Sequence, residues 1–127
     1  METKFHITNK TKSKIPPLPF NSIKEAVLGE KYELSLVFIG AKKSRELNKT
    51  YRAKDKVANV LSFPLTKNTG EIFISPAEAH KHAKEFGQNT TQFLGYLFIH
   101  GLLHLKGMEH GSTMEKAEKK VCKKFSI

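Results

Sequence analysis

The chain has 127 residues, of which 39% are hydrophobic and 27% charged, so wholesale disorder is excluded and one domain is expected over residues 1–127. Lysine and arginine number 22 against 12 aspartates and glutamates, and the resulting formal charge of +10 favours polyanions such as nucleic acids as partners. A single cysteine excludes an internal disulfide and gives no support for a disulfide-linked partner. No apolar stretch reaches the roughly 20 residues that cross a bilayer, and the first residues carry no signal segment, so we expect a cytoplasmic protein with no membrane partner.

The pattern of apolar residues and helix-capping residues predicts nine elements in chain order. Strands alternate with helices over the first half, and helices dominate the second. We expect strands at residues 3–8, 34–39, 59–65 and 71–75, and helices opened by Ser22 with Glu25, over residues 42–52, and opened by Ser75 with Pro76, Asn89 with Gln92, and Ser112 with Glu115. This order predicts an α+β fold in which a small mixed β-sheet is covered by about five helices.

The helix predicted to follow Asn89 is apolar on nearly every side, which is typical of a central, buried helix. It carries His100 and His104 four residues apart, so both project from one face, about 6 Å apart along the helix axis. Two imidazoles in this arrangement can converge on one metal ion. A lone histidine in such a helix is more often a hydrogen-bonded core residue, and the second histidine makes a ligand role an equally good interpretation.

A glycine and a third histidine complete the pattern. Gly107 can adopt the left-handed conformation that ends a helix, so the chain can turn back and bring His110 to the same point. Three neutral imidazoles leave the fourth position of a tetrahedral zinc ion open, which is the arrangement of a catalytic site. We therefore expect one zinc ion per chain, whereas His80 and His82 share none of this context and are interpreted as surface residues.

The spacing of the three histidines also occurs in metzincin proteases, in which a glutamate follows the first histidine and acts as general base. Here that position is Gly101, which has no side chain. Peptide hydrolysis by this mechanism therefore lacks its base.

A second polar segment covers residues 47–64, with the sequence LNKTYRAKDKVANVLSFP. Arg52 is permanently charged and can hold a phosphate through two parallel hydrogen bonds, but an arginine taken alone is more often an exposed surface charge. Asn59 lies at the start of a predicted strand. It could be a turn residue, or it could be a polar group that points into a cleft. The residues alone leave both questions open.

Together these segments resemble the YbeY family of bacterial endoribonucleases. The most specific block is HGLLHLKGMEH over residues 100–110, and the others are residues 47–64 and GEIFIS at residues 70–75. The blocks occur in the order and spacing of the family, and the resemblance covers nearly the whole chain. It differs at Val57 and Ala58, where the family often has Pro-Thr, and at Glu109, where an aspartate is common.

The resemblance implies an α+β fold, zinc, cleavage of single-stranded RNA, maturation of the 3′ end of 16S ribosomal RNA and ribosome quality control, with ribosomal RNA and the small ribosomal subunit as partners. It assigns His100, His104 and His110 as zinc ligands and Arg52 as a catalytic residue. Glu109 becomes a candidate for supporting a ligand or transferring a proton, and the candidate RNA contacts are Lys54 and Asn59.

Two other functions remain open at this point. One is a ribosome-associated RNA-binding module whose metal ion is structural, because Glu109 or another group could fill the fourth position. The other is a zinc hydrolase that acts on a peptide or a small phosphoester. The missing base at Gly101 disfavours the peptide, and the charge of +10 favours a polyanionic substrate.

Overall fold

Strands and helices follow one another in the predicted order in the computed structural model, which describes residues 4–127. Residue 3, at the start of the first predicted strand, lies outside the described residues. One short 3-10 helix, η1 (Lys84–Phe86), was not expected. The elements are β1 (Phe5–Asn9), α1 (Phe20–Leu28), β2 (Glu33–Phe38), α2 (Ala41–Arg52), β3 (Val60–Thr66), β4 (Thr69–Ile74), α3 (Pro76–Ala83), α4 (Thr90–Leu105) and α5 (Ser112–Lys124).

The four strands form one mixed sheet in the order β1-β2-β4-β3. β2 pairs in parallel with β1 and β4, whereas β3 and β4 form an antiparallel hairpin. The register aligns alternate residues of the two central strands, so that Leu36 lies opposite Ile72 and Phe38 opposite Ile74. All four are fully buried, because side chains two apart on a strand point to the same face. The predicted α+β fold with a mixed sheet is confirmed.

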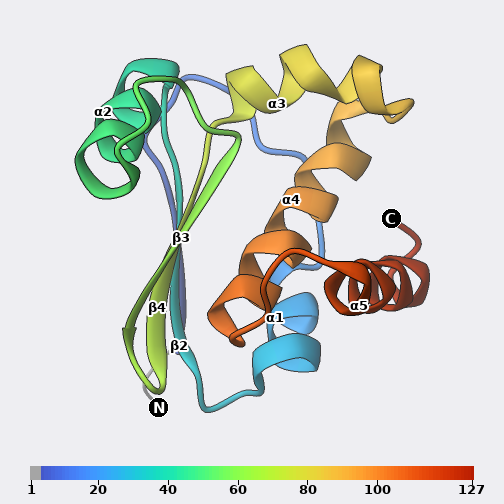
Figure 1. Cartoon of the computed structure of the whole chain (residues 1–127). Helices are drawn as coiled ribbons and strands as arrows, with labels where there is room; N and C mark the ends of the chain where they lie inside the picture. Colours follow the sequence, from blue (N-terminus) through green and yellow to red (C-terminus); the bar gives the residue numbers. More distant parts are fainter. Residues whose placement is uncertain (1–3) are drawn as a thin grey trace.

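Helices cover the two faces of the sheet unequally (Figure 1). α1, α4 and α5 lie on one side, with α4 running diagonally across it, and α2 lies on the other side near the upper end of the strands. α4 packs against β3 and β4 and also contacts α1, α3 and α5, so it is the central helix. Within the described residues, no helix combines the length and the apolar character needed to span a bilayer.

The start of α4 is defined by the predicted capping box. The Asn89 side chain accepts a hydrogen bond from the backbone N–H of Gln92, and the Gln92 side chain accepts one from the backbone N–H of Asn89. These bonds satisfy N–H groups that have no partner within the helix. Buried residues then occur on nearly every side of α4, including Phe93, Leu97 and Phe98. The expectation of a central, buried helix is confirmed.

The predicted start of the first helix is wrong. α1 begins at Phe20, two residues before Ser22, and it has no side-chain cap. Phe20 is buried and packs its ring edge-on against Phe98 at 5.1 Å between ring centroids, so tertiary packing decides where this helix begins. Pro19, which has no N–H to satisfy, precedes the first turn. α5 begins at Ser112 as expected, but without a side-chain cap, since Gly111 occupies the capping position.

Gly101 lies where α4 packs closely against the sheet. A Cβ at this position would lie 3.0 Å from the Ser62 hydroxyl oxygen and 3.2 and 3.3 Å from two side-chain carbons of Ile72. The Ser62 hydroxyl also donates a hydrogen bond to the Gly101 carbonyl at 3.0 Å. The absence of a side chain at Gly101 therefore has a packing reason.

Substitution Gly101→Ala should lower the free energy of unfolding by about 1 kcal/mol. Overpacking a core costs roughly 1–3 kcal/mol, and the better helix propensity of alanine offsets up to about 1 kcal/mol of that cost. Chemical denaturation of the variant, of Ile72→Val and of the double variant measures this effect. Because Ile72→Val removes one of the crowding carbons, the double variant should be less destabilised than the sum of the single changes. Strict additivity would contradict the packing explanation.

Candidate metal centre

Three histidines from two segments meet at the C-terminal end of α4. The ring centroids of His100, His104 and His110 lie 4.6 to 5.0 Å apart in all three pairs. One ligand nitrogen from each ring lies within 4.8 Å of the others. His100 and His104 are half-buried, whereas His110 is exposed. The predicted convergence of the three rings is therefore present in the structure.

His110 reaches the site because the chain reverses directly after α4. The Gly107 and Met108 backbone N–H groups donate to the carbonyls of His104 and Leu103, at 2.9 and 3.0 Å, which ends the helix. Gly107 has a φ of +102°, a conformation that residues with a side chain rarely adopt. This is the role expected for Gly107 from the sequence.

The hydrogen bonds of the two helical histidines determine which ring nitrogens are free. His104 Nδ1 lies 3.0 Å from the Met108 carbonyl oxygen, which can only accept, so this nitrogen carries the proton. His100 Nδ1 lies 3.3 Å from a Glu118 carboxylate oxygen and donates to it in the same way. In the neutral rings both Nε2 atoms therefore present lone pairs, and they face each other at 3.1 Å.

Two lone pairs at this distance repel each other unless a proton or a cation lies near both. Two nitrogens bound to one tetrahedral zinc ion are about 3.3 Å apart, close to the separation observed here. His110 is the most exposed of the three rings, so it can move to complete the coordination of an ion. The donor set, the tautomers and the spacing thus fit a divalent metal ion, so the histidines could hold one.

Burial lowers the pKa of His104 below its ordinary value of 6.5, and the charges of His100 and His110 lower it further. The Met108 carbonyl raises this pKa, and the charge of Arg52 lowers it. The net effect favours the neutral ring, which is the form that binds metal.

The histidines line an open cleft of about 1340 Å³, larger than the 300–1,000 Å³ typical of small-molecule sites. Four basic side chains and four acidic or amide side chains also line it: Arg52, Lys54, Lys56, Lys81, Glu78, Glu109, Asn48 and Asn59. The basic groups outnumber the carboxylates. An extended anion suits this cleft better than a compact neutral ligand.

The Arg52 side chain is exposed but held at two points. Its Nη2 donates a hydrogen bond to the Ser62 carbonyl at 2.6 Å, and its guanidinium carbon lies 5.3 Å from the centre of the Phe63 ring. Ser62 in turn contacts α4 through Gly101. The guanidinium therefore has a defined place in the cleft that contains the histidines.

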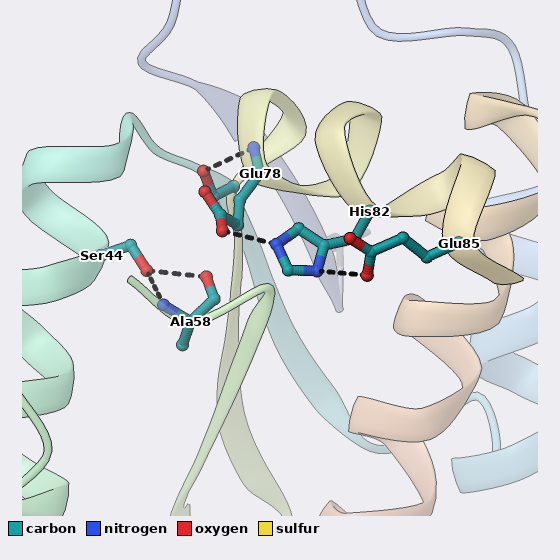
Figure 2. Close-up of polar contacts among 6 residues, drawn as sticks. Ser44, Ala58, Glu78, His82 and Glu85 are labelled. Carbon is teal, nitrogen blue, oxygen red and sulfur yellow. Dashed lines mark hydrogen bonds and ion pairs between the residues drawn. The ribbon is translucent and has the colours of Figure 1, made fainter. Parts of the chain in front are cut away.

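Two buried polar side chains of α2 hold the loop that leads to β3. The Ser44 hydroxyl donates to the Ala58 carbonyl at 2.7 Å and accepts from the Ala58 N–H at 2.9 Å (Figure 2). Asn48 Nδ2 donates to the Lys56 carbonyl at 3.0 Å. These bonds fix the loop that carries Lys54 and Asn59, and the sequence analysis had not singled out Ser44 or Asn48 for this role.

The candidate RNA contacts differ in their surroundings. Lys54 is exposed in the cleft wall. The Asn59 side-chain oxygen is buried and has no hydrogen-bond partner among the residues that the structure describes, although Asn59 lines the cleft. Buried polar atoms usually have a partner, so an oxygen without one is unusual.

His82, interpreted from the sequence as a surface residue, keeps 31% of its side chain exposed. Its side chain is half-buried and lines the cleft, with Nε2 2.8 Å from Glu78 and Nδ1 3.6 Å from Glu85 (Figure 2). Glu78 and Glu85 lie one turn before and after His82, so the three side chains meet along α3 and η1. His80 is exposed as expected and contacts Thr90.

Glu118 is the site residue that the sequence analysis missed. Glu109 is exposed and lines the cleft, whereas the carboxylate that contacts His100 comes from α5. One signal was present, because Glu118 lies on the helix face of Met114 and Val121, which packs against the core. An acidic residue on an apolar helix face needs a partner.

The sequence is similar to that of a known protein family over nearly its whole length. The sequence profile described as endoribonuclease YbeY matches residues 2–126. The chain belongs to the YbeY endoribonuclease family. A YbeY endoribonuclease of Lacticaseibacillus casei is 33% identical over 74% of this chain and 70% of its own length. Another, of Caldicellulosiruptor saccharolyticus, is 31% identical over 98% of this chain and 87% of its own length.

A solution structure of a Thermotoga maritima protein has the same fold. It matches with a TM-score of 0.65 and 24% identity, over 92% of this chain and 85% of the other. Membership of the YbeY family supports an endoribonuclease function, and the histidine cluster is consistent with the metal dependence of that family.

The lowered pKa of His104 predicts a pH dependence of stability in the metal-free YbeY-family protein. The folded state binds this proton less readily than the unfolded chain, so the contribution of His104 is complete above pH 6.5 and is lost as the pH falls from 6.5 through the lowered pKa. Urea unfolding in the presence of a chelator, between about pH 7.5 and 5.5, measures the slope of the free energy of unfolding against pH. The slope should be shallower in His104→Gln. Equal slopes in the wild type and in His104→Gln would contradict the lowered pKa of His104.

Proposed function

We propose that this protein is a zinc-dependent endoribonuclease that cleaves single-stranded RNA and that residues 1–127 act as one catalytic domain. The observation that carries the proposal is the 3.1 Å distance between the Nε2 atoms of His100 and His104, whose lone pairs face each other in a basic cleft. A cation-binding point and a surface suited to a polyanion thus coincide. Family membership supports RNA as that polyanion.

We propose His100, His104 and His110 as the ligands of one zinc ion. Imidazole also suits copper, nickel and iron, but three neutral nitrogen ligands with one open position are typical of catalytic zinc. When bound here, the ion would supply Lewis-acid polarisation of a phosphate oxygen and activation of water. The remaining tasks of binding and orienting the substrate belong to the side chains of the chain.

Arg52 is proposed to hold the scissile phosphate. One of its five N–H donors is used by the Ser62 carbonyl, and this bond, with the contact to Phe63, fixes the plane of the guanidinium. The other donors can bind two phosphate oxygens in parallel. Donors fixed in this way stabilise the negative charge that develops on the phosphate oxygens during cleavage.

Lys54 and Asn59 are proposed to bind RNA beside the scissile bond. The Lys54 ammonium can pair with a neighbouring phosphate, and such contacts weaken as salt rises. Asn59 lines the cleft, and its unpartnered oxygen, once turned towards the cleft, can accept a hydrogen bond from a ribose 2′-hydroxyl or a base amino group. Glu109, exposed beside His110, is proposed as a group that transfers a proton.

We further propose that the RNA is ribosomal, that the reaction matures the 3′ end of 16S ribosomal RNA and serves ribosome quality control, and that the protein acts in the cytoplasm on the small ribosomal subunit. The net charge of +10 supports a nucleic acid partner, and family membership supports the activity.

Removal of the metal should abolish cleavage and leave the fold largely intact. The reason is that α4 is held by its apolar contacts on several sides rather than by the histidines. Purified protein is treated with a chelator, and cleavage of single-stranded RNA is compared with the circular dichroism spectrum before and after zinc is restored. Unfolding of the chelated protein would instead identify a structural ion and an RNA-binding module.

Substitution Arg52→Ala should lower the rate of RNA cleavage by roughly 10²–10³-fold, the effect of removing one fixed donor to developing charge. Arg52→Lys should lose much of the rate as well, because an ammonium cannot form two parallel bonds. Arg45→Ala serves as the control, since Arg45 lies on the same helix but pairs with Asp55 outside the cleft lining. Equal rates for wild type and Arg52→Ala would remove Arg52 from the mechanism.

A further inference from the structure

Glu118 is an acidic residue buried where most of its neighbours on α5 are exposed lysines. Its exposed fraction is 6%, whereas Lys116, Lys119 and Lys120 are exposed. A buried carboxylate loses its hydration, and this cost is offset only by close hydrogen-bond donors. The position of Glu118 therefore requires an explanation in terms of the groups that it contacts.

Two donors reach this carboxylate, both from α4. His100 Nδ1 lies 3.3 Å away, and the Tyr96 hydroxyl donates a second hydrogen bond. Tyr96 and His100 are one helical turn apart, with ring centroids separated by 6.0 Å. Burial and the hydrogen bond to Glu118 raise the pKa of Tyr96 to about 12, so its hydroxyl keeps the proton that it donates.

The two ligand histidines on α4 are thus oriented by different kinds of acceptor. His104 donates to the backbone carbonyl of Met108, which side-chain substitution cannot remove. His100 donates to a carboxylate from another helix. A carboxylate at this place keeps the proton on Nδ1, directs the Nε2 lone pair into the site and increases its basicity.

We propose that Glu118 is a positioning residue for the metal site, which fixes the tautomer and orientation of His100, and that Tyr96 holds Glu118 in place. This inference rests on the proposed role of His100 as a ligand. It makes the affinity of the site depend on α5, a helix that contributes no ligand itself.

The experiment measures zinc binding and the tautomer of His100 in Glu118→Ala, Glu118→Gln and Tyr96→Phe. Zinc affinity is obtained by competition with a chromophoric chelator. The tautomer is read from ¹H–¹⁵N correlations across the imidazole rings of the metal-free protein. Glu115→Gln is the matched control, because Glu115 lies on the same helix near Tyr96 but is exposed and does not contact His100.

Glu118→Ala should weaken zinc binding by about 10–100-fold, as the loss of such a partner usually does, and the Nε2–H tautomer of His100 should appear. Glu118→Gln should keep the Nδ1–H tautomer, because its amide oxygen still accepts, and should lose less affinity than Glu118→Ala. Tyr96→Phe should give a smaller loss than Glu118→Ala, and Glu115→Gln should bind zinc like the wild type.

Wild-type affinity in a folded Glu118→Ala protein would overturn the inference, whatever the tautomer. If that variant does not fold, unchanged affinity in both Glu118→Gln and Tyr96→Phe would overturn it equally. The assay contains no RNA. A wild-type protein that binds zinc without cleaving RNA would therefore contradict the proposed function alone, whereas a wild-type protein that binds no zinc would contradict both.

Discussion

The burial of α4 between the sheet and three other helices determines how this helix is rotated about its axis. Phe98, Ile99 and Leu102 are fully buried, and Gly101 faces Ser62 and Ile72 across a close contact with the sheet. A rotation by one residue, about 100°, would turn the imidazoles towards the core and bring Ile99 and Leu103, or Gly101 and Leu105, to the places of His100 and His104. The narrow part of the α4 surface that is left facing the cleft therefore carries His100 and His104. Packing of apolar side chains thus fixes the orientation of the polar site.

The features predicted from sequence are those that depend on local spacing. Two histidines four residues apart on an apolar helix, followed by a helix-ending glycine, were sufficient to predict the convergence of three rings. The capping box at Asn89 was predicted for the same reason, since its partners are three residues apart. The strands were located to within two residues because short runs rich in β-branched and aromatic residues favour strands.

The features that were missed depend on contacts between distant segments. The start of α1 follows the burial of Phe20 against Phe98, and the role of Glu118 depends on a histidine 18 residues away on another helix. His82 was assigned to the surface because two histidines two residues apart face different ways, and this reasoning is correct for His80. Nothing local shows that the other face of α3 borders the cleft.

The turn between α4 and α5 has a consequence for the thermodynamics of metal binding. Two of the three candidate ligands sit on a rigid helix and need almost no ordering, whereas His110 lies in a short segment bounded by Gly107 and Gly111, both with positive φ. The conformational entropy lost on binding is therefore concentrated in this segment. An ion shared by the three rings would act as a removable cross-link between the end of one helix and the beginning of the next. Loop rigidity and metal occupancy would then be two measures of one equilibrium.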